Sequence, residues 1–121
     1  KLPSGPALPQ LAMDFQAYQE RSRTTARYPD AGRNPIYPTL GLCGEAGEVA
    51  EKVKKVLRDA GGLFSEPVRD DLLLELGDVL WYVAQLATEL DLSLDTIAER
   101  NLAKLASRAA RNVIGGEGDR R

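Results

Sequence analysis

The sequence predicts an all-α protein, a four-helix bundle-like unit of one domain that oligomerisation completes. Two long stretches, residues 41–59 and 66–90, repeat apolar side chains at helical spacing, and each carries carboxylates three residues apart. Glycine and proline clusters separate these stretches from their neighbours. A chain of 121 residues can bury one core, although a four-helix unit this small often completes it against another copy.

The N-terminal part is expected to hold a flexible arm, a first helix and a loop. Residues 1–10 contain three prolines and a glycine, which favour an extended arm. A modest amphipathic pattern predicts a helix over about 11–26. Three further prolines in 28–38 block a continuing helix and predict a loop, after which Thr39 is a plausible N-cap.

The stretch 41–59 has a one-sided apolar face with acids at its border. On a helical wheel of about 100° per residue, with Glu45 at zero, its apolar residues fall between roughly 20° and 120°. Glu48 lies about 60° beyond Glu45 on the other side. The apolar residues are Leu42, Ala46, Val49, Val53, Val56 and Leu57.

The stretch 66–90 repeats this arrangement with Glu75 and Asp78. Gly61-Gly62 is a helix stop, and Ser65 followed by proline is a helix start. The short connection predicts antiparallel neighbours, so the two carboxylate pairs can converge where the core meets solvent. Four carboxylates there would repel one another unless a cation neutralised them.

A fourth helix is expected from a cap at Ser93 or Asp95 to about Asn112. Asn101, Lys104 and Arg108 recur at helical spacing beside its apolar stripe, a pattern that by itself indicates a solvated basic face. Residues 113–121 form a polar, glycine-rich tail, which leaves 11–112 as the folded domain.

The residue types at the converging acids favour a hard cation. The chain has no histidine and one cysteine, whereas zinc and iron sites in helical bundles usually use imidazole or thiolate. An all-oxygen site suits Mg²⁺, with Mn²⁺ as a possible substitute, before Ca²⁺. Cys43 is expected to be a buried thiol without catalytic use, because no histidine can activate it.

The alternative is that the acids are a solvated helix face paired with Lys52, Lys54 and Lys55. Glu75 and Asp78 favour the metal, because no basic residue lies within four positions of either along the chain.

Three segments resemble the MazG-like nucleoside triphosphate pyrophosphohydrolases, an all-α superfamily. They are GEAGEVAEKVKK, ELGDVLWYVAQLA and NLAKLASRAAR, and the resemblance covers about residues 12–121. The family pattern is E-E-x-x-E, a spacer, then E-x-x-D. Its last four acids match Glu45, Glu48, Glu75 and Asp78. Gly44 stands where the first acid would be, which leaves the number of ions open, and Glu51 is either a substitute or a surface residue.

The resemblance implies Mg²⁺-dependent hydrolysis of a (deoxy)nucleoside triphosphate to the monophosphate and pyrophosphate, as nucleotide-pool housecleaning. The four matched acids would hold the ions, with Glu45 or Glu48 as the catalytic base. The resemblance also implies phosphate contacts from Asn101 and Lys104, and Arg108 would help to balance the charge of a triphosphate. Trp81 either packs against another helix or stacks on the base. Two rival functions remain, a nucleotide-binding regulator without turnover and a structural helical adaptor.

The composition limits the kinds of partner that we expect for the protein. An apolar content of 43% and a charged content of 28% are ordinary for a soluble protein, and the net charge of −2 argues against nucleic acid. No run approaches a membrane span and no signal peptide is visible, so no membrane partner is expected. A single cysteine excludes an intrachain disulfide and fits the cytoplasm. The expected assembly is a homodimer or homotetramer.

Overall fold

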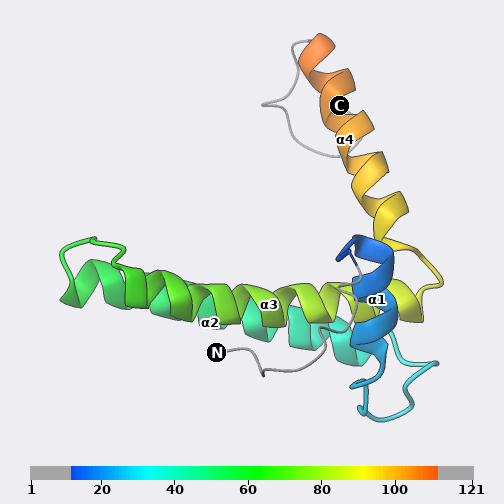
Figure 1. Ribbon diagram of the computed structural model, residues 1–121, viewed down its shortest axis with the longest axis horizontal. Coiled ribbons are helices and arrows are strands. Elements are labelled where there is room, and N and C mark those ends of the chain that lie inside the picture. Colours follow the sequence, from blue (N-terminus) through cyan, green and yellow to red (C-terminus); the bar gives the residue numbers. More distant parts are fainter. Residues whose placement is uncertain (1–11, 112–121) are drawn as a thin grey trace, which may run out of the picture.

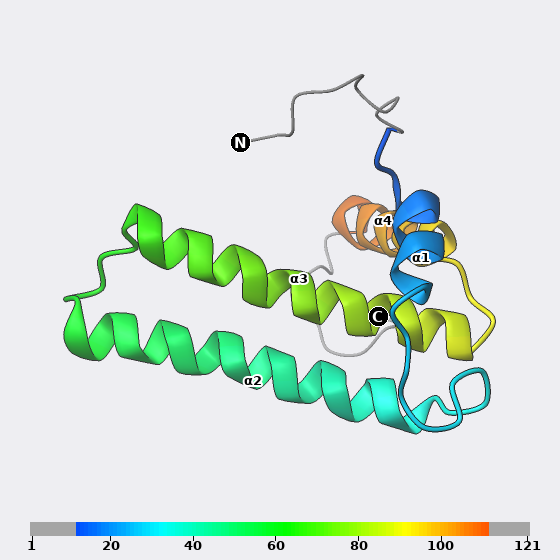
Figure 2. The same ribbon diagram turned by 60° about the horizontal axis from the view of Figure 1, so that its bottom comes forward.

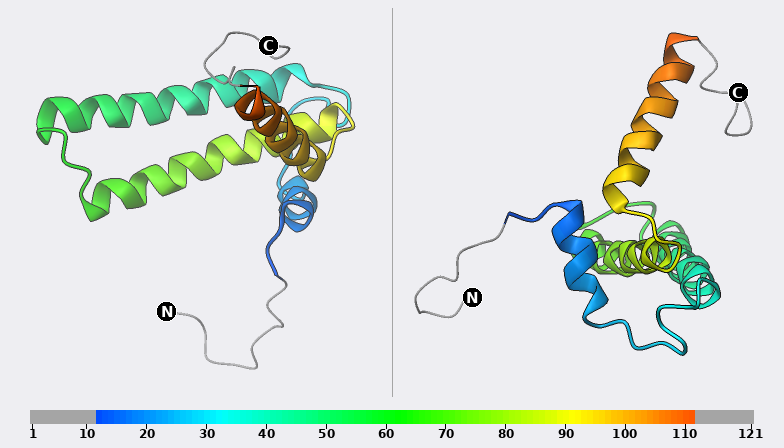
Figure 3. Two further views of the ribbon diagram at one scale, coloured as in Figure 1. Left: turned by 90° about the horizontal axis from the view of Figure 1, so that it is seen from above. Right: turned by 90° about the vertical axis from the view of Figure 1, so that its right-hand side faces the viewer.

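The computed structural model describes residues 12–111 and confirms the all-α class. Helices α2 and α3 lie side by side as a long antiparallel hairpin (Figures 1 and 2). Helix α1 crosses α3 near one end of this hairpin, and α4 projects from the same end (Figure 3). The part of the chain that the structure describes contains no strand. The helices are α1 Phe15–Arg23, α2 Ile36–Asp59, α3 Glu66–Glu89 and α4 Leu94–Ala110.

Helix α1 is shorter than the predicted 11–26. Its N-cap is Asp14, whose Oδ1 accepts a hydrogen bond of 2.7 Å from the Ala17 amide. At the other end, the Thr24 hydroxyl donates to the Arg21 carbonyl over 2.7 Å. Each of these hydrogen bonds satisfies a backbone amide or carbonyl that has no partner within the helix at its two ends. They therefore limit the helix to nine residues.

Helix α2 begins before the predicted start, at Ile36. The Asn34 Oδ1 accepts from the amides of Ile36 and Tyr37, at 3.2 and 3.1 Å, and so caps the first turn. Pro38 fits there because amides of the first turn have no intrahelical partner. The predicted loop therefore ends at Pro35 and not at Pro38, and the prediction of a cap at Thr39 was wrong.

The end of α2 and the starts of α3 and α4 agree with the sequence. Gly61 and Gly62 adopt φ of +60° and +81°, the left-handed conformation that lets glycine end α2. Ser65 occupies the N-cap position of α3, although its side chain makes no capping hydrogen bond. Ser93 caps α4 by accepting from the Thr96 amide at 3.1 Å.

The core lies where α1, α3 and the start of α4 meet. Ala84, Ala87 and Leu94 are buried there, with Tyr18 and Val83 packed against them. This core is small and sits at one end of the long hairpin (Figure 1).

Much of the apolar surface of the hairpin is exposed. Val56 is buried, but Leu57 and Leu76 are 67% and 56% exposed, so the predicted stripes are only partly covered within one chain. Cys43 is also exposed, which corrects the expectation of a buried thiol. Among the described residues, no helix is both long and apolar enough to cross a membrane.

Candidate metal centre

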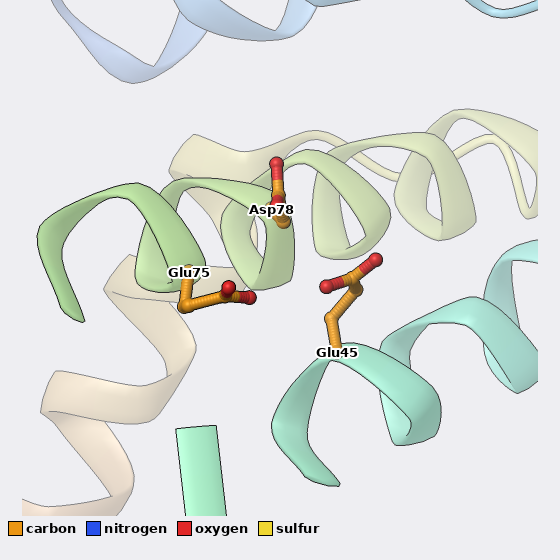
Figure 4. Close-up of side chains that lie close together, drawn as sticks. All are labelled: Glu45, Glu75 and Asp78. Carbon is orange, nitrogen blue, oxygen red and sulfur yellow. The ribbon is translucent and has the colours of Figure 1, made fainter. Parts of the chain in front are cut away.

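Three of the four predicted acids meet between α2 and α3. Glu45, Glu75 and Asp78 each offer a carboxylate oxygen, and these oxygens lie within 4.8 Å of one another. Figure 4 shows Glu45 of α2 and Glu75 of α3 pointing toward each other, with Asp78 one turn along α3. We call these three residues the acidic cluster.

The local sequence explains why these side chains meet. Glu75 and Asp78 are three residues apart and share a face of α3, while Glu45 stands at the border of the apolar face of α2. Burial raises the pKa of Glu45, and the charges of Asp78, Glu75 and Glu48 raise it further. Like charges brought this close favour a cation among them, and the all-oxygen donor set fits Mg²⁺ or Mn²⁺.

Glu48 lies outside the acidic cluster. It is exposed on α2, one turn beyond Glu45, although it is near enough for its charge to affect the Glu45 pKa. Glu51 is exposed one turn further on and pairs with Lys54 at 2.9 Å. That pair is the surface pairing considered for these acids, and it favours Glu51 as a surface residue.

Glu75 has a basic partner that its own helix does not supply. The Lys52 Nζ of α2 lies 3.7 Å from Glu75 Oε1. The sequence places Lys52 beside the acids of α2, but a helical wheel does not show how far one helix is shifted along another. The pairing across the hairpin was therefore not foreseen.

An aromatic ring lies between the two helices, one turn from the acids on each. Tyr82 follows Asp78 by one turn and lies over Gly41, which precedes Glu45 by one turn. A Cβ atom at Gly41 would overlap the Tyr82 ring at Cε1, so only glycine fits. Burial raises the pKa of Tyr82, and its interactions with Tyr37, Glu45 and Asp78 add to this increase.

Tyr82 belongs to a group of four rings, Tyr28, Tyr37, Trp81 and Tyr82, which we call the aromatic cluster. Tyr28 and Tyr37 stack with centroids 5.1 Å apart, and Trp81 meets Tyr28 and Tyr82 edge to face at 6.5 and 5.0 Å. Trp81 also donates from Nε1 to the Thr25 hydroxyl at 3.0 Å. Its ring is thus fixed against its own chain while remaining partly exposed.

A groove of about 440 Å³ runs beside Trp81, lined also by Tyr18, Arg21 and Met13. Burial raises the pKa of Tyr18, and so does the charge of Asp78, which places this side of α1 near the acidic cluster. The acidic cluster is therefore flanked on the α1 side by a partly apolar groove whose lining includes Tyr18 and Trp81.

Comparison with known families decides what kind of domain carries this arrangement. Residues 36–112 match the family model of the MazG nucleotide pyrophosphohydrolase domain, which spans more than half of the chain and all of α2, α3 and α4. The chain belongs to the MazG family.

One relative extends the similarity beyond the MazG domain. The chain is 54% identical over 114 residues to the Gene 37 protein of Mycobacterium phage L5, an alignment that covers 90% of this chain and all of the relative. No solved structure matches the chain.

The MazG domain also carries the three predicted phosphate-binding residues, on α4. Asn101 is exposed, Lys104 is half-buried and Arg108 is only 3% exposed. Helix α4 packs on α1 and extends away from the α2–α3 hairpin (Figures 1 and 3). Within one chain, the fold does not bring this row of residues to the acidic cluster.

A buried carboxylate that sequence reasoning missed holds the loop before α2. The Glu89 side chain is 0% exposed and accepts four hydrogen bonds, two of them from loop amides. Burial alone would raise its pKa, but the hydrogen bonds, led by that of the Tyr28 hydroxyl, outweigh burial and lower the pKa from 4.5 to about 2. The donors are Arg23, Tyr28, Gly32 and Asn34.

Proposed function

We propose that this MazG domain is a Mg²⁺-dependent nucleoside triphosphate pyrophosphohydrolase that acts in nucleotide-pool housecleaning. The acidic cluster carries the proposal, because three carboxylates from two helices converge beside a groove with aromatic walls. Membership of a nucleotide pyrophosphohydrolase family supports the same reaction.

The acids divide into two roles. Glu45, Glu75 and Asp78 would hold Mg²⁺. Mg²⁺ would neutralise phosphate charge and make water a better nucleophile. Water adds to the α-phosphorus while the bond to the β-phosphate oxygen breaks, which gives the monophosphate and pyrophosphate. Glu48 would accept the proton from water, since it lies outside the cluster and would keep its carboxylate free of the ion.

The base would lie in the groove beside Trp81. The aromatic cluster starts one helical turn from the acids, so a nucleotide with its phosphates at the acids reaches these rings. The hydrogen bond to Thr25 keeps the Trp81 ring in one orientation, which lowers the entropic cost of stacking a base on it.

We propose that the working form is a homodimer or homotetramer. One face of α3 exposes Leu73, Leu76 and Leu80, at 66%, 56% and 36%, and α4 exposes Leu102 at 68%. An apolar surface of this extent on so small a domain favours a second copy. In such an assembly, Asn101 and Lys104 would reach the phosphates of a neighbouring copy, with the buried Arg108 adding its charge.

Leu76→Glu is expected to convert the assembly into monomers, because it places a charge in the centre of the apolar stripe of α3. Light scattering coupled to gel filtration measures the mass. Leu63→Glu is the matched control, since Leu63 is 67% exposed in the turn between α2 and α3 and should keep the wild-type mass. A monomeric wild type would contradict the proposal.

The function is tested by pyrophosphate release from a panel of standard and modified (deoxy)nucleoside triphosphates, with and without Mg²⁺. We expect Mg²⁺-dependent release that Glu48→Gln lowers by about 10²- to 10⁴-fold, the usual contribution of a general base. Glu51→Gln removes the same charge from the same helix one turn away and should stay within about twofold, because Glu51 pairs with Lys54 at the surface.

Other outcomes would favour the two rivals. If nucleotide and Mg²⁺ stabilise the protein against heat but nothing releases pyrophosphate, the domain is a nucleotide-binding regulator. If neither ligand changes the melting temperature, the acids are surface charges and the domain is a helical adaptor.

A further inference from the structure

Lys52 differs from the other lysines of α2 in what it contacts. Its Nζ lies 3.7 Å from Glu75 Oε1 and joins α2 to α3, with the two side chains 36% and 20% exposed. Lys54 instead pairs with Glu51 of its own helix, and those side chains are 61% and 47% exposed. Lys52 is thus the lysine that the hairpin places against the acidic cluster.

Without a bound metal, the acidic cluster needs another source of positive charge. Its three carboxylate oxygens lie within 4.8 Å of one another, a spacing that is unfavourable when all three are ionised and unneutralised. The Lys52 ammonium supplies one positive charge at Glu75. A lysine can also withdraw it, because the ammonium is a compact charge on a flexible stem of four carbons.

The Lys52 side chain also borders a cavity that could hold it away from Glu75. It lines a cavity of about 310 Å³ on the side of the hairpin turn, together with Lys55, Val56, Asp59, Ala60, Val68 and Asp71. Apolar side chains of this cavity can cover the lysine stem, and the Asp71 carboxylate can accept the ammonium.

We propose that Lys52 is the counter-ion of the acidic cluster when no metal is bound. When a divalent cation binds, the Lys52 ammonium leaves the Glu75 carboxylate and the side chain turns into this cavity. The inference rests on the proposed metal site. It makes Lys52 a positioning residue, since it contacts a metal ligand rather than the reacting atoms. Because lysine and metal compete for one carboxylate, the ion must displace the ammonium, and removing the ammonium should tighten metal binding.

The test measures Mn²⁺ binding to the full chain without nucleotide, from the electron paramagnetic resonance signal of free Mn²⁺. Lys52→Gln is expected to lower the dissociation constant by about 3- to 10-fold, the size of a typical coupling between competing interactions. Lys54→Gln removes the same charge two residues away and should change it by less than about twofold, because exposed charges are screened. Lys52→Arg keeps the positive charge and should stay near wild type.

Melting temperature gives a second readout that does not depend on turnover. In chelator, Lys52→Gln should melt below wild type because the acidic cluster has lost its counter-ion. With saturating Mn²⁺, the increase in melting temperature should exceed that of wild type. Equal dissociation constants for Lys52→Gln and Lys54→Gln, or weaker Mn²⁺ binding by Lys52→Gln, would contradict the counter-ion role of Lys52. Neither result would contradict the proposed metal site. If wild type and all variants bind no Mn²⁺, the proposed metal site falls together with this inference.

Discussion

Asp78→Asn is expected to remove most metal-dependent turnover without weakening the fold. Asp78 is one of three acids whose oxygens lie within 4.8 Å, and losing its charge should cost several kcal/mol of transition-state stabilisation, about 10³-fold in kcat/KM. The same change relieves repulsion within the acidic cluster. The metal-free variant should therefore melt at the wild-type temperature or a few degrees above it.

The opposite signs of the two effects distinguish a functional acid from a structural one. Adding Mg²⁺ should raise the melting temperature of wild type and leave that of Asp78→Asn nearly unchanged, because a ligand stabilises only a protein that binds it. Asp70→Asn, an exposed charge-matched change on α3, should keep activity within about twofold. A variant that loses activity and stability together would mean that Asp78 supports the fold instead.

Local sequence patterns were enough to predict α3 and the meeting of the acids. Helix α3 was expected over 66–90 and spans Glu66–Glu89. The equal offset of the acids from each apolar stripe predicted their convergence, which the structure bears out for Glu45, Glu75 and Asp78. Both features depend on periodicity along one helix, which a sequence displays directly.

Features that depend on contacts between distant segments could not be predicted in this way. The Lys52 partner is set by how α2 is shifted along α3, and the early start of α2 depends on capping by Asn34. The sequence placed Asn101, Lys104 and Arg108 on one helix but contained no signal for the direction of α4.

Glu89 is the clearest case of a residue whose role the sequence conceals. Near the end of a predicted helix it resembles a surface acid, yet it is 0% exposed. Two of its donors are the amides of Gly32 and Asn34, more than fifty positions away along the chain. It ties the loop before α2 to α3, and this loop carries Tyr28 and Asn34, on which the aromatic cluster and the α2 cap depend.

Glu89→Gln is expected to be among the most destabilising single changes in this domain. The amide keeps the shape of the side chain but removes the charge and turns one acceptor into a donor that faces other donors. The pKa difference between 4.5 and about 2 corresponds to a loss on the order of 3 kcal/mol at pH 7. Urea denaturation measures the loss. The exposed Glu20→Gln on α1 is the control and should cost under about 0.5 kcal/mol.

The pH dependence of this loss identifies its cause. The folded-state pKa of Glu89 is lowered, so its contribution is fully present above the unfolded pKa of 4.5 and is lost as the pH falls toward 2. Protonated glutamic acid and glutamine are both neutral. The difference in unfolding free energy between wild type and Glu89→Gln should therefore be constant from pH 7 to about 5 and shrink steadily below pH 4.5. A difference that persists undiminished at pH 2.5 would contradict a role for the Glu89 charge and assign the loss to packing alone. If it shrinks, acid frees the loop that holds the aromatic cluster by removing one charge at Glu89.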